Sequence, residues 1–251
     1  MKKTSTLLAL GTALSIGSAQ AEIEGEVHAG YNSDYVFRGS DLGGSNYEVG
    51  ADIGGSLKCG IDWSLGVWYI DPDNGLEEVD LYGEISKDVA FGTLALGFVN
   101  YNYGNSGGVL DDDDNVIGVS EFKDDNEIYL SAATEFGGVG ASLSLVYGFS
   151  GSGTFDETLY LEGGLSYGFD VNEQFTGELA VDAGFFLDKG DSKTVLDEGF
   201  AFFSVTLSGS YAITEQVSFN PYLSFTSGDS DVWGDIDFDG AHGGASVAVA
   251  F

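Results

Sequence analysis

The stretch that decides the fold is the last one, Gly-Ala-Ser-Val-Ala-Val-Ala-Phe at residues 244–251. Ala245, Val247, Val249 and Phe251 fall on alternate residues, and small or polar side chains occupy the positions between them. Because successive side chains of a β-strand point to opposite faces, this alternation predicts a strand with one apolar face. The chain therefore ends in a strand that needs an apolar environment on one side only.

The other end of the chain has the pattern of an export signal. Lys2 and Lys3 precede a short apolar stretch at 7–16, and Ala19-Gln20-Ala21 forms a small-x-small cleavage site. These features predict a signal peptide at 1–21 and a mature domain at 22–251. No later run of residues approaches the ~18 to 20 apolar residues that a spanning helix requires.

Between the two ends, alternation with a period of two recurs about every twenty residues and predicts about twelve strands. The connections between these strands are alternately short and long. The short ones are 58–60, 87–90, 137–138, 170–174 and 212–216. The long ones, which are rich in acidic residues, are 38–46, 71–78, 103–125, 150–157, 188–198 and 227–240.

Connections that are alternately short and long are typical of a transmembrane barrel, in which odd-numbered and even-numbered hairpins lie at opposite membrane faces. We therefore predict an all-β fold over 22–251: a transmembrane antiparallel up-and-down barrel of about twelve strands. Its short turns would be periplasmic and its longer acidic loops extracellular, in the outer membrane of a bacterium. Many outer-membrane barrels end on an aromatic residue, so Phe251 predicts recognition by the barrel-assembly machinery, with outer-membrane lipid around the folded barrel.

The faces opposite the apolar ones carry ionisable side chains. A charged group facing lipid near the bilayer centre costs up to ~2 to 4 kcal/mol, so these groups require a wet lumen. Arg38 has the same inward parity and is placed at the pore mouth, paired with a carboxylate. The predicted pore-lining residues are Glu24, Glu26, His28, Glu48, Asp52, Asp62, Asp80, Glu84, Glu127, Glu135, Glu162, Glu178 and Asp182.

The overall charge limits the partners of the chain. Lys and Arg number 8 against 41 Asp and Glu, which gives a formal charge of −33 at pH 7. Nucleic acid and anionic lipid surfaces are repelled by such a chain, whereas cations are attracted. A solvated acidic surface in salty water explains the composition equally well. The single Cys59 excludes an intrachain disulfide.

Three segments resemble a known family. Ser33-Asp34-Tyr35-Val36-Phe37-Arg38-Gly39, at the end of the first predicted strand, is similar to the TorF-type porin family, as are the segments at 78–83 and 126–131. The similarity covers roughly the first 150 residues. It implies an outer-membrane barrel with a porin-like role and a poorly defined substrate, and it supplies no catalytic residues.

One loop motif suggests a metal. Asp235, Asp237 and Asp239, followed by Gly240, spell D-x-D-x-D-G, the opening of a calcium loop in which alternate carboxylates converge on one cation. The twelfth position is Ser246, where such loops carry a bidentate Glu. A solvated acidic loop is the alternative interpretation, and apart from this calcium the sequence predicts no cofactor.

No catalytic constellation is present, and we predict that the protein is not an enzyme. The favoured function is passive diffusion of small hydrophilic solutes, with cations preferred, through the acid-lined lumen. One alternative is a non-conducting structural or adhesive barrel with cation-binding acidic loops. Another is an exported soluble β-sandwich that binds its target with calcium. The sequence leaves open whether copies of the chain associate into a homo-oligomer.

Overall fold

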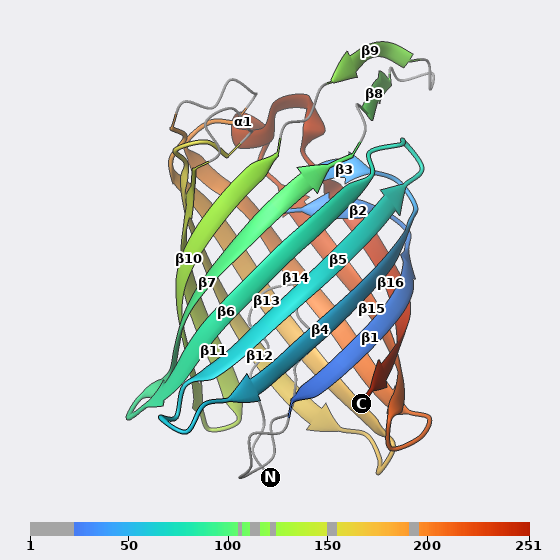
Figure 1. Ribbon diagram of the computed structural model, residues 1–251. Coiled ribbons are helices and arrows are strands. Elements are labelled where there is room, and N and C mark those ends of the chain that lie inside the picture. The colour runs from blue at the N-terminus through green and yellow to red at the C-terminus, as the bar shows by residue number, and fades with distance from the viewer. Residues whose placement is uncertain (1–22, 105–106, 111–115, 121–123, 150–154, 191–195) are drawn as a thin grey trace.

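The computed structural model describes residues 23–104, 107–110, 116–120, 124–149, 155–190 and 196–251. The predicted signal peptide lies outside the described residues. The described chain is almost entirely β-structure, and long strands joined by hairpins wrap round a single axis (Figure 1).

Twelve long strands form one closed antiparallel barrel, as the alternation predicts. They are β1 (Glu24–Asn32), β4 (Asn46–Ser56), β5 (Asp62–Pro72), β6 (Glu78–Val89), β7 (Gly92–Tyr103), β10 (Asp125–Phe136), β11 (Val139–Gly148), β12 (Leu159–Asp170), β13 (Phe175–Asp188), β14 (Gly199–Ala212), β15 (Val217–Gly228) and β16 (Asp239–Ala250). Shorter elements lie in the connections: β2 (Tyr35–Phe37), β3 (Ser40–Gly43), β8 (Gly107–Leu110), β9 (Val116–Ser120), the helix α1 (Ser230–Trp233) and a 3₁₀ turn at Gly234–Ile236.

The final stretch closes the barrel. β16 pairs antiparallel with β1, from Glu26 opposite Ala250 to Asn32 opposite Gly244. Phe251 extends this junction, because its backbone N–H donates to the Gly25 carbonyl at 2.9 Å. Closure removes the unpaired sheet edge that lipid could not solvate.

The outer face of the barrel is apolar. Leu130, Leu165 and Leu223 are 58%, 57% and 60% exposed, and they belong to the predicted apolar faces of β10, β12 and β15. A ring of strands with this exterior is stable in hydrocarbon and would aggregate in water. The protein is therefore a β-barrel of the bacterial outer membrane.

No helix in the described part of the chain is long and apolar enough to cross a bilayer.

The connections follow the predicted parity. The turns at 57–61, 90–91, 137–138, 171–174 and 213–216 lie at the end of the barrel that holds the start of β1 and the C-terminus (Figure 1). The remaining connections lie at the opposite end, here called the outer end. The length contrast fails once, because the outer connection at 73–77 is no longer than the turn at 57–61.

Candidate functional site

The lumen face carries the charges that the sequence predicts. All thirteen predicted pore-lining residues lie on barrel strands, on the face opposite the exposed apolar side chains. Glu26 on β1 faces Asp52 on β4, and Asp182 on β13 faces Gly164 on β12. Glu84, Glu178 and Asp182 are half-buried on the side of the inner turns, as expected for a polar lumen.

At the outer end the prediction of a wet lumen is wrong. Asp80 and Glu127 are only 1% and 2% exposed. Two neighbouring acidic residues, Glu78 and Asp125, are buried as well, at 1% and 0%. The carboxyl group of Asp80 lies against that of Glu78, and within the described part of the chain no amide, hydroxyl or basic group donates to it. These groups are dry because a connecting loop folds over them. The alternation of side chains along a strand does not predict such a cover.

That loop, called loop 1 (residues 33–45), joins β1 to β4 and contains β2 and β3. Tyr35 donates its hydroxyl to Glu78 Oε2 at 2.6 Å, and β4 and β5 lie between β1 and the strand of Glu78. Arg38 reaches farther, to Glu127 on β10, beyond β4, β5, β6 and β7 in the ring. Loop 1 therefore crosses the lumen, and Figure 1 shows β2 and β3 lying within the outer end of the barrel.

Arg38 makes the central contact of loop 1. Its guanidinium donates to both carboxylate oxygens of Glu127, at 2.6 and 2.9 Å, and Tyr101 donates its hydroxyl to the same carboxylate at 2.9 Å. Burial by itself lowers the pKa of Arg38, but the Glu127 carboxylate raises it above its ordinary value. The predicted pairing with a carboxylate is confirmed, although Arg38 is 8% exposed and lies inside the barrel rather than on an open rim.

Aromatic rings surround this ion pair. The Arg38 guanidinium carbon lies 4.6 Å from the ring centre of Phe37, 5.3 Å from that of Phe155 and 4.3 Å from that of Tyr160. Cations over ring faces are attracted by the ring quadrupole, most strongly when water is excluded. The bidentate geometry and the rings together hold the guanidinium in one place.

A second outer connection, called loop 6 (residues 229–238), covers loop 1. Trp233 of α1 donates its indole N–H to the Arg38 carbonyl at 3.0 Å, and the Phe238 amide donates to the Gly39 carbonyl at 2.8 Å. Gly39 has φ 86°, and a Cβ there would clash with Phe202 Cβ. Glycine is therefore required where loop 1 turns against the wall.

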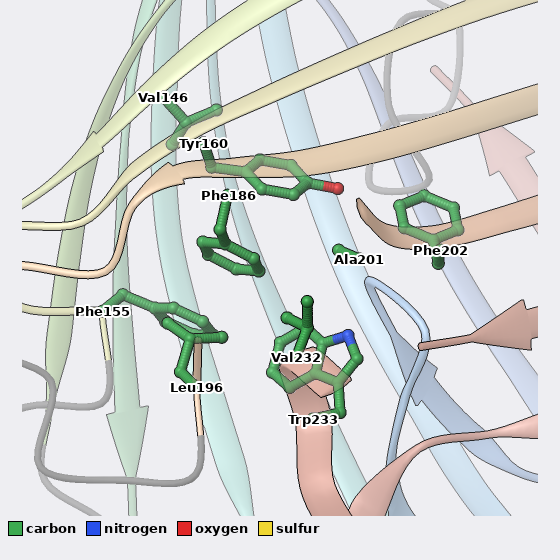
Figure 2. Close-up of a cluster of buried hydrophobic side chains, with 9 residues drawn as sticks. All are labelled: Val146, Phe155, Tyr160, Phe186, Leu196, Ala201, Phe202, Val232 and Trp233. Carbon is green, nitrogen blue, oxygen red and sulfur yellow. The ribbon is translucent and has the colours of Figure 1, made fainter. Parts of the chain in front are cut away.

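An apolar cluster fills the rest of the outer end. Figure 2 shows side chains from β11–β14 converging with those of α1 and of two outer connections. Phe186 packs on Tyr160 and Trp233, with ring centres 4.7 and 5.4 Å apart. Phe37 of loop 1 packs against this cluster. The cluster is formed by Val146, Phe155, Tyr160, Phe186, Leu196, Ala201, Phe202, Val232 and Trp233.

Inward tyrosines and a tryptophan hold several lumen carboxylates in place. Tyr82 donates to Asp52 at 2.6 Å and Tyr129 donates to Glu84 at 2.9 Å. Trp68 donates its indole N–H to Glu48 at 3.1 Å. Such donors stabilise a carboxylate as the charged acceptor.

Basic residues contribute little to the lumen. Lys58 lies in an inner turn, Lys87 has outward parity on β6, and Lys189 lies in an outer connection, 3.1 Å from Asp197. Arg38 is thus the sole Lys or Arg of the described ranges that points into the barrel, and Glu127 matches its charge. The lumen has a large excess of negative charge.

The predicted calcium ligands are not brought together. Asp235 lies in the 3₁₀ turn, Asp237 follows it and Asp239 begins β16. In the ranges that the structure describes, no three His, Cys, Asp or Glu side chains are grouped to hold a metal ion.

The sequence interpretation missed Tyr35, Glu78 and Asp125 as residues of the site. The connections expected at 71–78 and 103–125 include Glu78 and Asp125, yet the alternation through Asp80 and Glu127 reaches both by a step of two residues. That continued parity was the available signal. Tyr35 carries no such signal, because its position depends on the path of loop 1.

Comparison with solved structures identifies the same architecture in several outer-membrane proteins. The NanC porin is 15% identical with a TM-score of 0.51, covering 90% of this chain and 98% of that one. The COG4313 outer membrane channel from Pseudomonas putida F1 is 8% identical with a TM-score of 0.54, covering 94% and 97%. The KdgM porin in complex with disordered oligogalacturonate is 8% identical with a TM-score of 0.51, covering 91% and 99%. At these identities the likeness concerns the fold.

No family model and no curated protein matches the sequence. The resemblance to the TorF-type porin family therefore stays a prediction.

Proposed function

We propose that the protein is a porin-like channel for passive diffusion of small hydrophilic solutes, with cations preferred. The observation that carries this proposal is the excess of inward carboxylates over inward basic groups. Carboxylates in a narrow lumen with low-dielectric walls concentrate cations and repel anions. The porin and channel barrels with the same fold support the channel role.

The substrate of a similar structure is not carried over to this chain. KdgM is described in complex with oligogalacturonate, whose sugar units each bear a carboxylate. This lumen offers such a polyanion no free basic side chain within the described residues, and its carboxylates would repel it. Neutral or positively charged small solutes fit the lumen better.

The test of cation preference is the reversal potential of the folded protein across a planar bilayer in a KCl gradient. We expect the sign of a cation-selective pore. The Glu178→Gln/Asp182→Asn protein should have a lower cation-to-anion permeability ratio, because two half-buried lumen charges are removed. The matched control, Glu173→Gln/Glu215→Gln, removes the same charge from exposed inner turns and should change the ratio little. Anion preference in the unmodified protein would refute the proposal.

The packed outer end favours a second candidate, a non-conducting structural barrel. Loop 1, loop 6 and the apolar cluster leave the residues there almost without solvent exposure. The two candidates differ in one observable, which is ionic current through protein shown to be folded by its altered gel mobility before boiling. Absence of current under all voltages would favour the structural role.

A further inference from the structure

We infer that loop 1 is a gate, that the Arg38–Glu127 ion pair is its latch, and that current requires the loop to leave the lumen. This inference rests on the proposed channel function and adds its regulation. The described structure is the closed state, because Arg38, Tyr35 and Phe37 fill the space between β6, β10 and the apolar cluster.

Loop 1 can move without opening the wall. The β1–β4 ladder is complete on both sides of the loop, and its last pair is Asn32 opposite Asn46. The Asn32 side-chain amide also donates to Asn46 Oδ1 at 2.8 Å, which ties the two stems together. The segment between them is therefore an excursion from an intact hairpin. Ser33 and Ser45 at its ends bond to Gly243 and Asp73, and displacement of 34–44 breaks no hydrogen bond of the β1–β4 ladder.

The contacts that hold loop 1 inside join side chains and loop backbones, and they combine polar bonds with aromatic packing. Its tip is attached to the wall by Arg38 on Glu127 and Tyr35 on Glu78. Its backbone meets loop 6 at three neighbouring points: the Arg38 carbonyl accepts from the Trp233 indole, the Gly39 carbonyl accepts from the Phe238 amide, and Ser40 forms an isolated bridge with Asp237. Towards the return to β4 the loop becomes exposed at Asp41. A docked segment of this kind undocks locally, at a lower free energy than the barrel unfolds.

The closed state also has a cost that the open state relieves. Asp80 lies dry beneath loop 1, beside the equally buried carboxyl group of Glu78. Two adjacent acidic groups kept from water are unfavourable when ionised, and water entering after the loop departs would solvate them. The ion pair and the apolar cluster favour closure, whereas hydration of Asp80 favours opening. Loop 1 thus has one set of interactions that favours the closed state and another that favours the open state, as a switching element requires.

Charge reversal tests the latch. In the Arg38→Glu protein two carboxylates face each other, and in the Glu127→Arg protein two guanidinium groups do. Each change should shift the closed-to-open ratio by about 100-fold or more, because a buried pair is broken and a buried charge left unpaired. Single-channel recordings should therefore show higher open probability in both single variants. The Arg38→Glu/Glu127→Arg double variant restores opposite charges and should return to the closed behaviour of the unmodified protein.

A second kind of variant tests the gate even if the charge-reversal proteins do not fold. Removal of 35–43, joining Asp34 to Gly44, leaves β1 and β4 intact and should give the largest steady conductance. Equal, cation-selective current in the unmodified, single, double and shortened proteins would overturn the gate and leave the channel standing. A double variant as open as the single variants would overturn the latch. No current in any folded variant, the shortened one included, would overturn the channel function itself.

Discussion

Trypsin added to the Glu127→Ala protein is expected to cleave after Arg38 at a rate roughly 100-fold or more above that of the unmodified protein. Arg38 is 8% exposed and its guanidinium is held by both Glu127 oxygens, so the protease reaches it only when loop 1 undocks. Removing one partner of a buried ion pair costs about 3 to 5 kcal/mol, since the other charge remains buried and unpaired. Cleavage follows the population of the opened form when opening is fast.

The measurement is mass analysis of fragments over time, which separates cleavage after Arg38 from cleavage at the exposed Lys189. Glu178→Ala is the matched control, because it removes an inward carboxylate of β13 that does not contact loop 1. Cleavage after Arg38 should be unchanged in this control. A Glu127→Ala protein as resistant as the unmodified one would show that the ion pair does not hold loop 1.

The Leu165→Arg protein is expected to lose about 2 to 4 kcal/mol of its free energy of unfolding in lipid vesicles, the cost of a basic side chain near the bilayer midplane. Leu165 lies in the middle of β12 and is 57% exposed on the outer face. Its loss of stability is read from the midpoint of urea-induced unfolding, followed by tryptophan fluorescence.

The neighbouring residue supplies the control. Ser166 lies on the same strand with opposite parity, opposite Gly140 and Ala180 on the lumen face. An arginine there meets water and the lumen carboxylates, so Ser166→Arg should change stability far less than Leu165→Arg. Equal losses in the two variants would mean that the two faces of β12 do not differ as the fold requires.

Most of the barrel was predictable because its determinants are local. Alternation at Ala245, Val247 and Val249 depends only on the pleat of one strand, and connection parity depends only on the up-and-down path. The inward parity of Asp80 and Glu127 follows from the same rule. Such features can be read from short windows of sequence, without knowledge of distant contacts.

The closed outer end could not be predicted in the same way. Once loop 1 leaves the ladder after Asn32, no periodicity fixes its path. The partner of Arg38 lies 89 residues farther along the chain and across the lumen, so the identity of Glu127 is a tertiary outcome. The calcium motif illustrates the opposite limit of local patterns. Asp235, Asp237 and Asp239 match a local pattern, but the chain passes from a 3₁₀ turn into a strand there and does not gather them.

The most direct test of the account is water access at two adjacent positions of β12. Single cysteines at 165 and 166, in a Cys59→Ser background, are placed in lipid vesicles with a positively charged, water-soluble thiol reagent on both sides of the membrane. The account predicts labelling of Ser166→Cys and protection of Leu165→Cys, because hydrocarbon covers one face and water the other. Rapid labelling of Leu165→Cys, or protection of Ser166→Cys, would contradict a barrel with a lipid-covered exterior and a wet lumen.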